Sequence, residues 1–321
     1  MFARILRPVL AAAALVAATG AALAQGQPIR LIFPFAAGGG GDGLARLLGE
    51  ALRAELGEPV IVENRVGADG RIGVRAVAQA APDGRTLLFT PFGPIVLHPS
   101  VYASLPYDPL KDLAPVSQVA RIEFALSTGP MTGATSLKEL VTWLKANPAR
   151  AAYGSPGAGT VPHFSGILFA TAAGVEMRHA PYRGTSPALN DLVAGQVPVA
   201  STPSSDATEL HRAGKIRILA TSGAQRSPFL PDVPTYKEQG YDIEGEGWYA
   251  VYATAGTPKA MVDRLSAIIV KAMSNPETKA FVEKLRLVPT GTTAEELARI
   301  QAADFERWKK PIAESGFKPT D

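Results

Sequence analysis

Short runs of β-branched and aromatic residues alternate with segments of helical periodicity along the first part of the chain. The apolar runs are Ile29 to Phe33, Val60 to Val62 and Thr86 to Thr90, and the helical segments are Leu44 to Leu56 and Ile72 to Ala80. This alternation is typical of α/β units, in which a helix follows each strand and covers the sheet. We therefore predict an α/β fold.

The segment from Leu44 to Leu56 shows the helical pattern most clearly. Its apolar positions are Leu44, Leu47, Leu48, Ala51, Leu52 and Leu56, and its charged positions are Arg46, Glu50, Arg53 and Glu55. The two sets occupy opposite faces of a helix with 3.6 residues per turn, so one face is expected to pack on a sheet.

A second set of units is expected to begin near Phe124. We predict helices from Ser136, over about Val161 to Ala173 and from Ser186, and strands near residues 151–153, 177–180, 197–200 and 216–221. Ser136 and Glu139 have the spacing of a capping box, in which each side chain satisfies a free backbone N–H of the first helical turn.

The C-terminal part has an aromatic strand and then helices. The strand is expected over Gly247 to Tyr252 and the first helix over Pro258 to Met273. Asn275 followed by proline predicts a second helix start, and Thr293 with Glu296 repeats the capping-box spacing.

The first 24 residues have the pattern of a signal peptide. Arg4 and Arg7 precede an apolar run from Val9 to Ala18, and a small-x-small motif ends at Ala24. The run is shorter than the roughly 20 residues of a membrane span. We expect residues 1–24 to be removed after Ala24 and the mature protein to be exported.

Composition narrows the possible functions. The 321 residues include no cysteine, so disulfide scaffolds, cysteine-ligated metals and cysteine nucleophiles are excluded. The formal net charge is only +3, and no block of Lys and Arg suggests a nucleic-acid partner. This length suggests about two domains.

The most conspicuous motif is the glycine run from Gly38 to Gly41, followed by Asp42 and Gly43. Its spacing also fits a dinucleotide-binding fingerprint, with Glu63 at the position of the ribose-binding acid. However, residues 34–37 separate the run from the strand, and an exported enzyme would have to carry the nucleotide with it. The interpretation that we favour is an anion site at a helix start, with Asp42 as the helix N-cap.

A similar glycine-rich loop spans residues 153–160, again between a predicted strand and a predicted helix. Two such loops could face each other across a cleft and hold a carboxylate with backbone N–H groups and hydroxyls. Two unrelated tight turns are the alternative.

Catalytic motifs are scarce. The histidines His98, His163, His179 and His211 lack metal-site spacing, and there is no G-x-S-x-G elbow. We predict no catalytic residue, no metal site and no cofactor.

Taken in order, the motifs resemble the substrate-binding receptors of tripartite tricarboxylate transporters, the Bug family. The matching segments are Pro34-Phe35, Gly38-Gly39, Asp42, Ala45-Arg46, Val60 to Arg65, Gly67, Gly70, Ile72-Gly73, Pro82 to Leu88, Tyr153 to His163, Tyr182-Arg183-Gly184, Pro187-Ala188, Gly195-Gln196-Val197, Ala213-Gly214-Lys215 and Trp248 to Pro258. They cover essentially the whole mature chain.

This resemblance implies a two-lobed periplasmic binding protein fold of type II, with the chain crossing twice between interleaved lobes. The first lobe would comprise residues 25–123 and 246–321, and the second lobe residues 124–245. The implied function is capture of a small organic carboxylate between the lobes and its delivery to the permease subunits of a membrane transporter. We expect a monomer. An exported hydrolase-like enzyme using the same cleft, or a ligand-sensing module for a signalling receptor, are the alternatives.

Carried over by position, the resemblance implies ligand contacts in both lobes. In the first lobe these are Phe35, Ala36, Ala37, Gly38, Gly39, Gly40, Gly41, Asp42, Thr90, Pro91 and Phe92. In the second lobe they are Ser155, Gly157, Gly159, Thr160, His163, Tyr182, Arg183, Gly184 and Thr202.

Two positions depart from the family pattern. Ala36 and Ala37 stand where prolines are frequent, which suggests a less rigid loop. Ser201 and Thr202 stand where many members have phenylalanine and aspartate. The missing carboxylate would disfavour a ligand with an ammonium group and favour a plain carboxylate.

Overall fold

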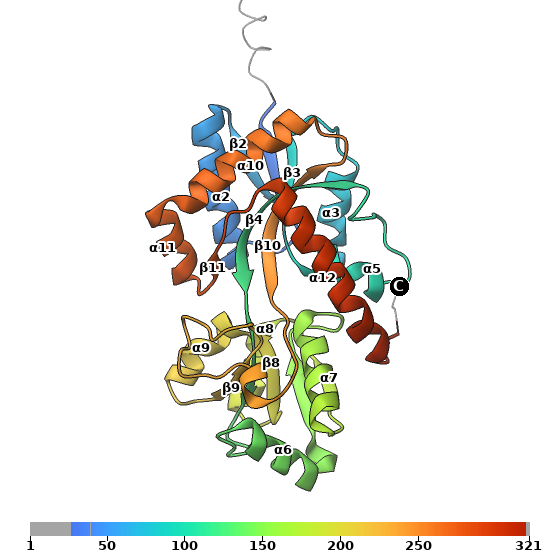
Figure 1. Cartoon of the computed structure of the whole chain (residues 1–321), viewed down its shortest axis with the longest axis vertical. Coiled ribbons are helices and arrows are strands. Elements are labelled where there is room, and N and C mark those ends of the chain that lie inside the picture. Colours follow the sequence, from blue (N-terminus) through green and yellow to red (C-terminus); the bar gives the residue numbers. More distant parts are fainter. Residues whose placement is uncertain (1–26, 39, 319–321) are drawn as a thin grey trace, which may run out of the picture.

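The structure is a computed structural model that describes residues 27–38 and 40–318, and it has two lobes, each built on one β-sheet (Figure 1). The predicted signal peptide and Gly39 lie outside the described residues. The first lobe contains a six-stranded sheet of order β11-β4-β10-β3-β1-β2, and the second a five-stranded sheet of order β7-β6-β8-β5-β9. The predicted α/β fold is confirmed.

The first part of the first lobe follows the predicted alternation. Its elements are β1 (Ile29–Phe33), α2 (Gly40–Leu56), β2 (Val60–Asn64), η2 (Ala68–Gly70), α3 (Arg71–Ala78), β3 (Thr86–Pro91), α4 (Gly93–Val96), α5 (His98–Val101) and β4 (Leu113–Ile122). Strand β1 pairs in parallel with both β2 and β3, because a helix carries the chain back across the sheet between successive strands.

The second lobe contains the middle of the chain. Its elements are β5 (Phe124–Thr128), α6 (Leu137–Ala146), η3 (Pro148–Arg150), β6 (Ala152–Ser155), α7 (Val161–Ala173), β7 (Arg178–Pro181), α8 (Thr185–Val193), β8 (Val199–Pro203), α9 (Ser204–Arg212), β9 (Arg217–Thr221) and η4 (Lys237–Gln239). Strand β6 pairs in parallel with β7 and β8, whereas β5 is antiparallel to β8 and β9.

The chain then returns to the first lobe. The returning elements are β10 (Gly247–Thr254), α10 (Lys259–Ser274), α11 (Pro276–Lys284), β11 (Val288–Pro289) and α12 (Ala294–Glu314). Strand β10 enters the six-stranded sheet antiparallel to β3 and β4 because it arrives from the opposite lobe. Both sheets are therefore mixed: β10 and β11 run against the other strands of the first sheet, and β5 runs against the other strands of the second.

The two crossings are joined to each other by hydrogen bonds of Ser222. Its N–H donates to the carbonyl of Phe124 at 2.9 Å, and the Phe124 N–H donates to the Ser222 hydroxyl at 3.0 Å. That hydroxyl donates to the carbonyl of Gly245 at 2.6 Å. Phe124 is the first residue of β5, which follows the first crossing, and Gly245 lies just before β10, which follows the second. The two segments that connect the lobes are therefore adjacent and hydrogen-bonded to each other through Ser222.

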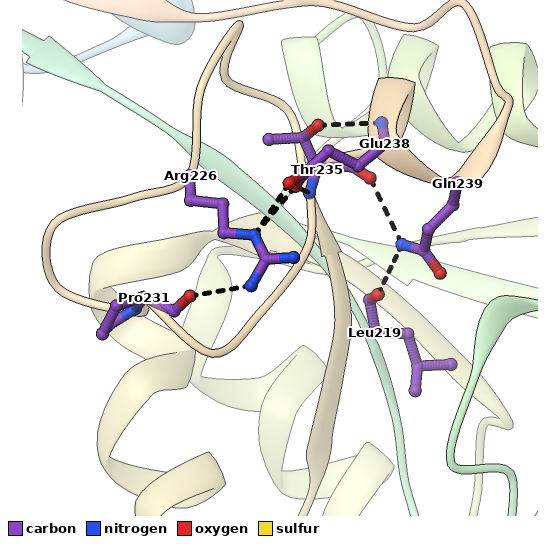
Figure 2. A network of polar contacts seen from close by, with 6 residues as sticks. All are labelled: Leu219, Arg226, Pro231, Thr235, Glu238 and Gln239. Atoms are coloured by element: carbon purple, nitrogen blue, oxygen red, sulfur yellow. Dashed lines mark hydrogen bonds and ion pairs between the residues drawn. The ribbon is translucent and has the colours of Figure 1, made fainter.

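A proline-rich loop precedes the second crossing and is held by polar contacts (Figure 2). The Arg226 guanidinium pairs with Glu238 at 2.9 Å and donates to the carbonyl of Pro231 at 3.0 Å. Glu238 accepts the N–H of Thr235 at 2.7 Å, and the Gln239 amide donates to the carbonyl of Leu219 on β9 at 2.9 Å. The loop is thus fastened to the edge strand of the second sheet.

Helix α12 connects the two lobes on one side of the molecule, where its C-terminal end lies next to α7 (Figure 1). Trp308 and Ile312 of α12 share a buried apolar cluster with Val161 and Phe164 of α7. The Phe164 and Trp308 rings have centroids 6.3 Å apart. Apolar packing therefore joins the lobes along this side.

The helix starts differ partly from expectation. The Thr293 and Glu296 capping box is present, and Asn275 caps α11. At α6, Ser136 accepts from the N–H of Glu139, but the Glu139 carboxylate bonds to Thr135 instead of returning to Ser136. Asp42 is not an N-cap, because the glycines before it already adopt helical geometry and α2 begins at Gly40. In the described part of the chain, no helix is long and apolar enough to span a membrane.

Candidate functional site

The carboxyl ends of the parallel strands in both lobes face the space between the lobes. In the first sheet, Tyr249 near the start of β10 pairs with Pro91 at the end of β3. The start of β10 is where the chain arrives from the second lobe. In the second sheet, the beginning of β5 pairs Phe124 with Pro203 at the end of β8. Since β1 is parallel to β3 and β6 is parallel to β8, both glycine-rich loops leave their sheets on the side that faces the other lobe.

The first-lobe loop is arranged around the carboxylate of Asp42. This carboxylate accepts the N–H of Gly38 at 3.1 Å, the amide of Asn64 at 2.9 Å and the guanidinium of Arg46 at 3.0 Å. The Asn64 amide also donates to the carbonyl of Phe35 at 3.0 Å. Burial alone would raise the pKa of Asp42, but the bonds from Asn64, Arg46 and Gly38 hold it below its ordinary value. Asp42 is therefore ionised and shapes the loop, while its oxygens are occupied.

The loop itself is open to solvent. Ala36, Ala37, Gly38 and Gly40 are exposed, Phe35 is half-buried, and Gly41 and Asp42 are buried. A Cβ at Gly41 would lie 2.6 Å from the Phe33 ring and 3.1 Å from the hydroxyl oxygen of Tyr249. Close approach of the helix start to these two rings therefore requires glycine at this position. Exposed backbone at a helix start offers N–H donors to an anion.

The second-lobe loop is braced by hydroxyls and by two stacked histidines. The hydroxyls of Ser155 and Thr160 both donate to the carbonyl of Gly157, at 3.0 and 2.8 Å. The Ser155 oxygen also lies 2.8 Å from Nε2 of His179. The rings of His163 and His179 are stacked with centroids 3.9 Å apart.

These contacts assign the tautomers of both histidines. Because Ser155 has one proton and gives it to Gly157, Nε2 of His179 must donate to the serine oxygen. Nδ1 of His163 accepts the N–H of Gly159 at 3.1 Å, so this nitrogen carries no proton. Burial lowers the pKa of each histidine to about 4, and for His163 the charge of His179 adds to the effect. Both rings are neutral at neutral pH.

The third segment of the expected site follows β7. Its backbone is tied to the second-lobe loop, because Tyr182 donates its N–H to Ser155 and Gly184 donates to Pro156, at 2.9 and 3.0 Å. The Tyr182 hydroxyl donates to Asp191 at 2.8 Å, and Arg183 is exposed. The structure thus brings Ser155, Gly157, Gly159, Thr160, His163 and residues 182–184 together.

Other expected contacts lie deeper in the lobes. Phe92 is 2% exposed and packs edge-on against Trp248, with centroids 5.3 Å apart. Thr90 is buried within β3, and Pro91 is half-buried at its end. Thr202 is fully buried on β8, where its hydroxyl has no hydrogen-bond partner. These side chains support the surface that faces the other lobe.

Two residues near this space were not among the expected contacts. Tyr249 lies near the start of β10 and next to Gly41, and Asp206 lies in the first turn of α9, directly after β8. The helix α9 was not predicted, although Ser204, Ser205 and Asp206 together are typical of a helix start after a strand. Within the described residues, no group of three or more histidine, aspartate or glutamate side chains could hold a metal ion.

Comparisons with known proteins agree with this architecture. The sequence profile of the family described as "Tripartite tricarboxylate transporter family receptor" matches residues 44–317. The Bordetella pertussis protein BugT is 34% identical over 314 residues, which cover 96% of this chain and 95% of BugT.

Two solved structures have similar folds. The R. palustris protein Rpa4515, solved with adipate, is 31% identical with a TM-score of 0.82, covering 91% of this chain and 98% of that chain. MatC from Rhodopseudomonas palustris, solved with bound malate, is 28% identical with a TM-score of 0.77, covering 89% and 98%. The two-lobed fold, the facing glycine-rich loops and the match over most of its length place this chain in the tripartite tricarboxylate transporter receptor family, to which the Bug proteins belong.

Proposed function

We propose that this protein is a periplasmic receptor that closes its two lobes around a small organic carboxylate and delivers it to the permease subunits of a tripartite tricarboxylate transporter. The observation that carries the proposal is the pair of glycine-rich loops at the facing carboxyl ends of parallel strands. The adipate and malate in its structural relatives support the choice of a carboxylate.

Backbone donors rather than net charge would bind the anion. In the first lobe, Ala36, Ala37, Gly38 and Gly40 are exposed at the start of α2. In the second lobe, Ala158 is exposed, and Gly157 and Thr160 are half-buried, just before α7. Charge-assisted bonds of this kind each contribute about 1.5 to 3 kcal/mol when sheltered from water. Closure of the lobes supplies that shelter.

The division of the chain and the contact residues belong to the same proposal. We propose that one lobe comprises residues 25–123 and 246–321 and that the other comprises residues 124–245. With these bounds, both crossings lie beside Ser222. We propose that the ligand contacts are residues 36–41 and the segments 155–163 and 182–184. Export to the periplasm as a monomer is proposed from the N-terminal pattern and the family.

The proposal favours binding over catalysis. The Ser155 and His179 pair superficially suggests a nucleophile and base, yet the serine proton goes to Gly157 and His179 donates to the serine. A general base would have to accept that proton. We infer that this pair positions the loop.

A thermal-shift screen of carboxylates tests the proposal. A ligand at 100 times its dissociation constant should stabilise the protein by about 2.7 kcal/mol. We expect adipate, malate or a related acid to raise the melting temperature, and calorimetry to show one site. A shift with a neutral sugar and with no carboxylate would contradict the anion site, and conversion of the bound acid on long incubation would indicate an enzyme.

A further inference from the structure

The helix α9 presents one face to the first lobe. Glu209 of α9 forms an ion pair with Arg286, which belongs to the first lobe. Leu285, next to Arg286, lies 3.9 Å from the position of a Cβ at Gly40, so this contact is beside the first-lobe loop. Asp206 precedes Glu209 by three residues and therefore lies on the same face of α9, one turn nearer to the sheet.

The neighbours of Asp206 belong to both halves of the candidate site. Thr185, which follows Gly184, hydrogen-bonds to its carboxyl group and partly offsets the effect of burial on its pKa. On the other side, the pKa of Tyr249 is raised to about 12 by burial and, additionally, by the charge of Asp206. The Tyr249 hydroxyl lies 3.1 Å from the position of a Cβ at Gly41. Asp206 thus stands between the segment after β7 and the start of α2.

The carboxyl group of Asp206 is open to a ligand. The residue is exposed, yet burial raises its pKa, as expected for a carboxylate that solvent reaches from one side only. Glu209 is neutralised by Arg212 and Arg286, whereas no Lys, Arg or His in the described part of the chain forms an ion pair with Asp206. The hydroxyls of Ser205 and Thr185 donate to this carboxylate, which retains acceptor capacity for a donor on a bound molecule.

We propose that Asp206 is a specificity-determining residue, which accepts a hydrogen bond from an ammonium or hydroxyl group carried by the carboxylate held between the two loops. The inference rests on the proposed receptor function and deepens it. Thr202, which stands at the position of the family aspartate, carries no charge and is buried in β8. Asp206 supplies a negative charge from the helix that follows, so the ligand class changes from a plain carboxylate to a hydroxy or amino carboxylate.

Two matched series of acids test this assignment by calorimetry on the mature protein. Succinate, malate and aspartate share one carbon skeleton and differ only at C2, and adipate and 2-aminoadipate extend the comparison to a longer skeleton. We expect the wild type to bind a donor-bearing acid at least about tenfold more tightly than its plain analogue. Asp206→Asn should reduce the preference for the amino acid by about tenfold or more and leave the plain acid bound equally well or better.

The controls separate this role from general effects. Asp232→Asn removes the same charge from an exposed position in the proline-rich loop and should leave every affinity unchanged. Asp206→Ser provides a second variant, and its melting temperature without ligand checks that the fold is kept. Equal binding of plain and donor-bearing acids by the wild type, or an unchanged preference in both variants, would overturn the role of Asp206. Binding of no carboxylate at all would instead overturn the receptor function.

Discussion

At the scale of single residues, the second-lobe loop depends on the backbone of Gly159. Its φ is +71°, and a Cβ there would lie 2.5 Å from Cγ1 of Val101 on α5 of the first lobe. Gly159→Ala should therefore lower the free energy of unfolding by about 1 to 3 kcal/mol, through left-handed strain and overpacking. Urea denaturation measures the change.

Gly157 provides a matched control in the same loop. A Cβ there would meet Cγ2 of Thr160 at 3.6 Å, an ordinary contact distance. Gly157→Ala should cost clearly less than Gly159→Ala. If both variants lost the same free energy of unfolding, the close approach of Gly159 to Val101 would not be the cause of the loss.

The stacked histidines predict a pH dependence of stability. The pKa of His163 is lowered from 6.5 to about 4 by burial and by His179, so the unfolded chain binds a proton that the folded chain does not between these values. Stability is therefore full above pH 6.5 and falls as the pH drops toward 4, by at most about 1.4 kcal/mol per pH unit for each such histidine.

His163→Asn isolates this contribution. The asparagine oxygen can accept the N–H of Gly159 as Nδ1 does, but it does not titrate. Unfolding in urea at pH 7 and pH 5 should show a smaller loss for the variant than for the wild type. His98, whose pKa burial also lowers to about 4, contributes equally to both proteins. An unchanged pH dependence would be evidence against a neutral, buried His163.

At the scale of elements, periodicity predicted those strands and helices whose residues carry the pattern themselves. Strand β1 has the expected bounds, and α2 extends the expected helix toward the glycines. Strand β4 was not predicted because Leu113 to Ile122 lacks a regular alternation of polar and apolar residues and contains Pro115, and its partner β10 lies far along the chain. Helix α9 was missed because it is largely polar and contacts the first lobe through an ion pair instead of an apolar face.

The candidate site shows the same division. The glycine-rich loops and residues 182–184 carry local motifs and were predicted as contacts. Asp206 and Tyr249 carry no motif, and their proximity to the loops arises only when two sheets face each other. The expected preference for a plain carboxylate rests on Thr202 alone and stays a prediction, which the role proposed for Asp206 would reverse.

At the scale of the whole molecule, the two sides of the interlobe space differ. Apolar packing between α12 and α7 joins the lobes on one side, and the pair between Arg286 and Glu209 joins them near Gly40. A packed apolar contact resists separation more than an ion pair whose glutamate is 66% exposed. Opening is therefore expected to begin at the ion pair.

A double-mutant cycle tests this asymmetry. Arg286→Gln and Glu209→Gln should each weaken carboxylate binding by about two- to fivefold, and the double variant should lose little more than either single one. The effect should shrink at high salt. Arg212→Gln is the control, because Arg212 pairs with Glu209 within α9 and does not cross between the lobes. Additive losses would mean that the pair does not stabilise closure.

The class of fold, most strands and helices of the parallel units, and the loops at their carboxyl ends could all be predicted from local sequence. These features depend on short-range periodicity and on turn-forming residue types, both of which are properties of residues close together in the chain. The antiparallel entry of β10, the contact between α12 and α7, and the position of Asp206 near both loops became visible only in the folded molecule. Those features depend on contacts between residues far apart in the chain, because the crossing strands bring the two lobes face to face.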